Sequence, residues 1–101
     1  MSIKKQVLKS KPVCKVSFKI SKEQADHASE VALLGDFNEW NPLADIMNKL
    51  KDGSFSYNIE LPAGSSYCFR YLADGTTWFD EPEADGYERG EFGAVNNVIS
   101  T

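Results

Sequence analysis

Residues 12–21 read PVCKVSFKIS, and this stretch decides the fold class because apolar and polar residues alternate along it. Lysines and a serine stand between the apolar residues. Successive side chains of a β-strand point to opposite faces, so a period of two is typical of a strand with one buried face. The residues expected on the buried face are Cys14, Val16, Phe18 and Ile20.

Short strand-like segments follow along the rest of the chain, and helical periodicity is almost absent. Asp52-Gly53 and Asp74-Gly75 each predict a tight hairpin, because this dipeptide tolerates the positive φ values of such turns. The pattern predicts an all-β fold, an immunoglobulin-like antiparallel β-sandwich. The further segments expected as strands lie at 30–37, 46–51, 54–61, 66–73, 76–79 and 96–100.

Length and charge limit the organisation and the partners. A chain of 101 residues fits one compact domain, which we expect at 12–101 after a flexible segment at 1–11. The net charge of -4 has the wrong sign for nucleic acid or anionic lipid. The basic N-terminal segment lacks the apolar region of a secretory signal, and no stretch has membrane-spanning length, so we expect a cytoplasmic protein.

The two cysteines are expected to be free thiols. Cys14 falls on the apolar side of its strand. In SYCFRYLAD the aromatic residues Tyr67, Phe69 and Tyr71 favour the core face, so Cys68 points the other way. Opposite orientations argue against a disulfide and fit a reducing compartment.

Three segments in order carry a family likeness: GDFNEWNP, FRYLADGTTW and FGAVNNVI. They resemble the isoamylase early-set domains and the glycogen-binding module of the AMP-activated kinase β subunit, with small free-standing early-set proteins looking closest. The likeness runs from about Val13 to Ser100. It implies an immunoglobulin-like sandwich that often binds α-glucan, usually beside a glycoside-hydrolase domain.

The resemblance also implies site residues. Trp40 and Trp78, the only two tryptophans, match the stacking positions, and a flat indole suits the apolar C–H face of a glucose ring. Arg70 stands where the kinase module has a lysine that bonds sugar hydroxyls. Asn96 matches a hydroxyl-binding asparagine, and Phe92 matches an apolar residue that covers the glucan.

The register of the second hairpin decides whether Trp78 can stack on a sugar. A three-residue loop ending at Gly75 would place Arg70 and Trp78 together on the non-core face. A two-residue turn would place Trp78 opposite Tyr71, on the core side. The chain has two threonines between the glycine and the tryptophan, where the kinase module has one residue, and both registers stay open.

Each of these residues also has a plainer interpretation. A tryptophan in a small sandwich more often packs in the core. Arg70 could be a solvated strand residue, and Asn96 could satisfy backbone groups. The acidic segment 80–91 does not fit the spacing of a calcium-binding EF-hand loop, and His27 has no metal-ligand partner nearby in sequence, so we expect no metal and no cofactor.

The sequence therefore predicts non-catalytic binding of α-1,4-glucan, such as glycogen, starch or maltooligosaccharide, through surface tryptophans. No nucleophile motif or phosphate loop indicates an enzyme. The alternative is a protein-interaction or scaffold domain that associates with a glucan-metabolising enzyme, because exposed tryptophans also suit protein interfaces.

Overall fold

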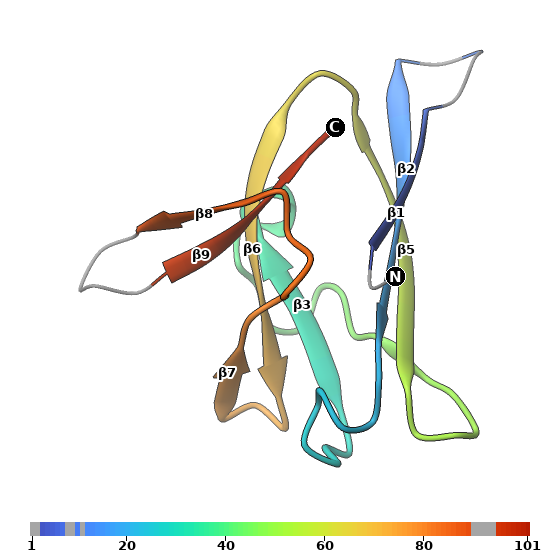
Figure 1. Ribbon diagram of the computed structural model, residues 1–101, viewed down its shortest axis with the longest axis vertical. Helices are drawn as coiled ribbons and strands as arrows, with labels where there is room; N and C mark the ends of the chain where they lie inside the picture. Colours follow the sequence, from blue (N-terminus) through green and yellow to red (C-terminus); the bar gives the residue numbers. More distant parts are fainter. Residues whose placement is uncertain (1–2, 8–9, 11, 90–94) are drawn as a thin grey trace.

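Two antiparallel sheets face each other in the computed structural model, which describes residues 3–7, 10, 12–89 and 95–101 (Figure 1). No α-helix occurs in these ranges, and none of their helical segments could span a membrane. The all-β, immunoglobulin-like sandwich predicted from the sequence is confirmed. The first sheet has the order β1-β2-β5-β4, with β1 at Ile3–Val7, β2 at Val13–Ile20, β5 at Phe55–Pro62 and β4 at Asn48–Lys49.

The second sheet has the order β3-β6-β9-β8, and β7 pairs with β6 beside this path. A short 3₁₀ turn, η1 at Asp36–Asn38, follows β3. The chain ends on β9, so the C-terminus lies on the second sheet (Figure 1). The strands are β3 at Val31–Gly35, β6 at Ser66–Ala73, β7 at Thr77–Phe79, β8 at Gly86–Arg89 and β9 at Val95–Ser100.

The core lies between the sheets and is built from the faces that alternation predicts. Phe18 of β2 meets Phe69 and Tyr71 of β6 edge-to-face, with ring centroids 5.3 and 6.5 Å apart. Edge-to-face aromatic pairs stabilise a core beyond the area they bury. Cys14 is buried on this side of β2, and both cysteines are free thiols, as predicted.

The second hairpin has a register that differs from both predicted ones. Asp74 and Gly75 have positive φ values of 50° and 71°, and the Thr76 amide donates to the Ala73 carbonyl at 3.0 Å. The ladder then starts one residue later than a two-residue turn would allow, at Ala73 and Thr77. Trp78 therefore lies opposite Leu72, on the non-core face.

Two segments expected to lack strands contain them. The segment 1–11 was predicted to be flexible, but Ile3–Val7 pairs with β2, and Ile3 is buried. The Lys5 ammonium donates to Asp85 at 2.8 Å and to the Ser100 carbonyl of β9 at 3.0 Å, and so ties β1 to the second sheet. The acidic connection 80–91 contains β8, at Gly86–Arg89.

The start of that acidic connection is anchored by a carboxylate inside the protein. Glu81 is fully buried and accepts a hydrogen bond from the Tyr71 hydroxyl at 2.8 Å. Its own amide donates to Asn97 at 3.1 Å, and its carbonyl accepts from the Tyr87 hydroxyl at 2.7 Å. Burial and the neighbouring carboxylate raise the pKa of Tyr71 well above its ordinary value. Buried polar groups need such partners, so the segment after β7 is held firmly.

Candidate functional site

The outer face of the second sheet carries an apolar strip. Core residues of β3 and β6 alternate with residues that point away from the first sheet, and some of these outward residues are apolar. Ala32, Leu34 and Leu72 form a small buried cluster outside the main core. Trp40 and Ile46 pack against it and are themselves half-buried. Trp78 faces Leu72 across the β6–β7 ladder, so both tryptophans border the same strip.

Trp78 and Arg70 are in contact on this face. The Arg70 guanidinium lies over the indole of Trp78, 4.8 Å from the ring centroid. A cation over an aromatic face is attracted by the electron density of the ring. Trp78 remains 43% exposed, so part of the residue is open to a ligand beside the guanidinium.

Arg70 has one hydrogen-bond donor without a partner in the described residues. Its Nε atom is buried and makes no hydrogen bond, and the nearest carboxylate oxygen, on Asp80, is 3.9 Å away. The approach to Asp80 is too long for a hydrogen bond, so this buried donor is one of the few left unsatisfied.

Trp40 sits in a loop with an unusual backbone. Glu39 and Trp40 have φ values of 57° and 58°, in the left-handed region that non-glycine residues seldom adopt. The Trp40 amide donates to the Gly35 carbonyl at 3.0 Å and to Asn38 Oδ1 at 3.1 Å. The indole Nε1 donates to Asp36 Oδ1 at 3.0 Å. Backbone and ring are thus both fixed.

Asn38 connects this loop to the first sheet. Its amide nitrogen donates to Asp45 Oδ2 at 2.7 Å and to the Leu33 carbonyl at 2.9 Å. The other oxygen of Asp45 accepts a hydrogen bond from the Tyr57 hydroxyl of β5. That hydrogen bond, with burial, raises the pKa of Tyr57 to about 12. One network therefore sets the position of the loop relative to both sheets.

Gly35 is required by the close approach of the chain to β6. A Cβ atom there would lie 2.6 Å from the Cys68 carbonyl oxygen and 2.7 Å from the Phe37 ring. Both distances are far below van der Waals contact. Glycine at this position lets the start of the Trp40 loop lie directly against β6.

The structure brings four of the five predicted residues to one face. Trp40, Arg70 and Trp78 border the apolar strip, as described above. Asn96 belongs to the same face, because its neighbour Asn97 is buried opposite Phe69 and strand side chains alternate. Phe92 lies outside the described residues. The role of these residues in binding stays a prediction.

A comparison with protein families matches residues 18–101 to the family described as the glycogen recognition site of AMP-activated protein kinase. This chain belongs to that glycogen-recognition family. The matched range contains every predicted site residue and all strands except β1 and residues 13–17 of β2. No curated protein matches the chain.

Sequence reasoning for this glycogen-recognition domain missed Asp36 and Leu72. Asp36 occurs in the segment GDFNEW, four residues before Trp40. This closeness in sequence was the only indication that the two side chains could meet. Leu72 follows the last aromatic core residue of β6, and only the observed register shows that it lies opposite Trp78.

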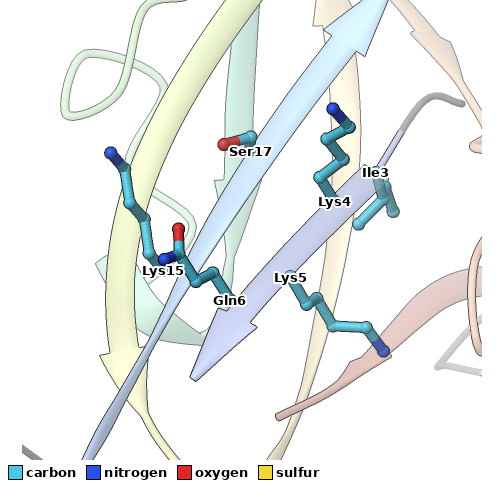
Figure 2. Close-up of a pocket in the computed structure, with 6 residues that line it drawn as sticks. All are labelled: Ile3, Lys4, Lys5, Gln6, Lys15 and Ser17. Atoms are coloured by element: carbon cyan, nitrogen blue, oxygen red, sulfur yellow. The ribbon is translucent and has the colours of Figure 1, made fainter. Parts of the chain in front are cut away.

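The outer face of the first sheet carries lysines in place of an apolar strip. A hollow of about 550 Å³ lies over β1 and β2, lined by Ile3, Lys4, Lys5, Gln6, Lys15 and Ser17 (Figure 2). Lys5 points away from Lys4 and Lys15, toward Asp85. No aromatic ring is present in this lining. Within the glycogen-recognition domain, the hollow therefore offers charge without a surface on which a sugar could stack.

Proposed function

We propose that the domain binds α-1,4-glucan, such as glycogen, starch or maltooligosaccharide, on the outer face of the second sheet, without catalysis. The observation that carries the proposal is the pair of tryptophans beside one apolar strip. Trp40 comes from the loop after β3 and Trp78 from β7, yet both adjoin Leu72 or its cluster. Membership of a glycogen-recognition family supports the same ligand class.

The binding mode follows from the groups that remain available. The axial C–H groups of glucose present an apolar face, and an indole plane removes that face from water. Trp40 already gives its N–H to Asp36, so it supplies its ring alone. Arg70 and Asn96, which are both half-buried on this face, supply polar groups for the sugar hydroxyls.

Two carboxylates near the tryptophans, Asp36 and Asp80, already have partners, which supports binding without catalysis. Both oxygens of Asp36 accept hydrogen bonds, and Asp80 lies beside the Arg70 guanidinium. Glycoside hydrolysis requires one carboxyl group to donate a proton and a second to act as base or nucleophile.

Calorimetric titration of the full chain with maltoheptaose tests the proposal. Shallow surfaces bind weakly, so we expect a Kd on the order of micromolar to millimolar. Trp40→Ala should remove the saturable heat. Leu43→Ala, which removes an 82% exposed apolar side chain from the same loop, should leave it unchanged. No heat for the wild type at millimolar sugar would reject glucan binding and favour the protein-interaction alternative.

A further inference from the structure

We propose that Asp36 is the positioning residue of the sugar platform. Its carboxylate fixes the indole of Trp40 against β6 and so sets the plane on which a glucose ring stacks. The inference rests on the proposed function and adds to it a residue that makes no contact with the sugar.

The two carboxylate oxygens of Asp36 serve two different segments. Oδ1 accepts the indole N–H of Trp40 at 3.0 Å, and Oδ2 accepts the backbone N–H of Cys68 at 2.8 Å. Cys68 lies in β6, two residues before Arg70. One side chain therefore joins the ring of the loop to the strand that carries the proposed hydroxyl-binding arginine.

The position of Asp36 follows from the way the β3–β6 ladder ends. The last pair is Gly35 with Phe69, so Asp36 would be the next partner of Cys68. The backbone instead turns into η1, and the Asp36 side chain takes the Cys68 amide in place of a ladder carbonyl. The hydrogen bond to the Cys68 amide therefore fixes the Asp36 carboxylate relative to β6.

Separate groups hold the backbone and the ring of Trp40. The backbone, with its positive φ, is held by Gly35 and Asn38. The only hydrogen bond of the indole among the described residues is to Asp36. Changing Asp36 should therefore free the ring while the loop keeps its path. The two N–H donors use different oxygens of Asp36, and asparagine has an NH2 donor in place of one oxygen, so it cannot replace the aspartate.

The experiment compares Asp36→Asn with Glu39→Gln, which removes one charge from the same exposed loop without breaking a described contact. Maltoheptaose affinity is measured by calorimetry, and the indole ¹H–¹⁵N resonances are followed by NMR, with Trp40→Phe assigning the signal. For Asp36→Asn we expect affinity to fall roughly tenfold, as for loss of a charge-assisted hydrogen bond. The Trp40 resonance should move and its N–H exchange faster, while the Trp78 resonance keeps its position. Glu39→Gln should change neither.

Unchanged affinity for Asp36→Asn would overturn the proposal, and so would lowered affinity with an unchanged Trp40 resonance. If Asp36→Asn does not fold, hydrogen exchange in the wild type decides. The Trp40 indole N–H should exchange more slowly than that of Trp78, which has no acceptor among the described residues, and equal rates would contradict a fixed ring. If the wild type itself binds no glucan, the proposed function fails, and with it the role of Asp36 in binding. The indole signals then report only whether Asp36 holds the ring.

Discussion

The two outer faces of the sandwich arise from the same strand alternation but differ in chemistry. On the first sheet, outward positions of paired strands hold Lys4, Lys15 and Glu60, which need only water. On the second sheet, outward positions hold Leu72 and Trp78. Folding requires an apolar inner face, but it does not require an apolar outer one. Leu72 is itself covered by the protein, whereas Trp78 stays exposed, so the second sheet is the side on which to test glucan binding.

The substitution Trp78→Ala should cause the largest loss of maltoheptaose affinity. Truncating a stacked tryptophan costs about 2 kcal/mol of binding free energy, equivalent to roughly a 30-fold loss of maltoheptaose affinity. Because the side chain is 43% exposed, the melting temperature should change little. Trp78→Phe, which keeps a smaller ring, should recover part of the affinity. Titration calorimetry and thermal melts measure both effects, and full affinity in Trp78→Ala would remove Trp78 from the site.

Removing one charge from each face compares the two faces directly, and the expected change in affinity is smaller. Arg70→Ala deletes the guanidinium that lies over Trp78, and we expect affinity to fall about tenfold, as for a hydrogen bond to a charged group. Lys15→Ala deletes one charge from the hollow of the first sheet (Figure 2), and affinity should stay within about twofold, as for a distant site. Equal losses in the two variants would mean that overall charge, not a local contact, governs binding.

The smallest expected effect is on stability at high pH. It concerns the hydrogen bond from the Tyr57 hydroxyl of the first sheet to Asp45. The pKa of Tyr57 is raised to about 12 by its bond to Asp45 and by burial, so the folded protein holds the phenol proton more tightly than the unfolded chain. The stabilisation is complete below pH 10, near the ordinary tyrosine pKa, and is lost as pH rises toward 12. Urea unfolding between pH 9 and 12 should show a shallower decline for Tyr57→Phe than for the wild type. Parallel declines would show that Tyr57 does not carry the effect.

Alternation and turn chemistry made the fold predictable from sequence. The alternation in β2 reports directly which face is buried, and it fixed the orientation of Cys14. Asp74-Gly75 identified the turn but not its register. Thr76 adds one residue to a two-residue turn, and this moves Trp78 from the core face to the outer face. The site could therefore be proposed from the resemblance, while its geometry required the structure.

Other features depend on partners that are distant in sequence. β1 buries little more than Ile3, so its own pattern is too weak to predict a strand. Glu81 resembles a solvated residue of an acidic loop, yet it is buried because Tyr71 supplies a hydrogen bond. Asp36 gains its role from an amide of β6, 32 residues away. Such long-range pairing leaves no local pattern in the sequence.

The most direct measurement is an NMR titration of the ¹⁵N-labelled chain with maltoheptaose. We expect the chemical shift changes to be largest at Trp40, Arg70 and Trp78, including both indole signals. Residues of the opposite face, such as Lys4 and Ser17, should keep their positions. Changes centred on the first sheet, or no changes at millimolar sugar, would contradict the claim that the second sheet carries a glucan site.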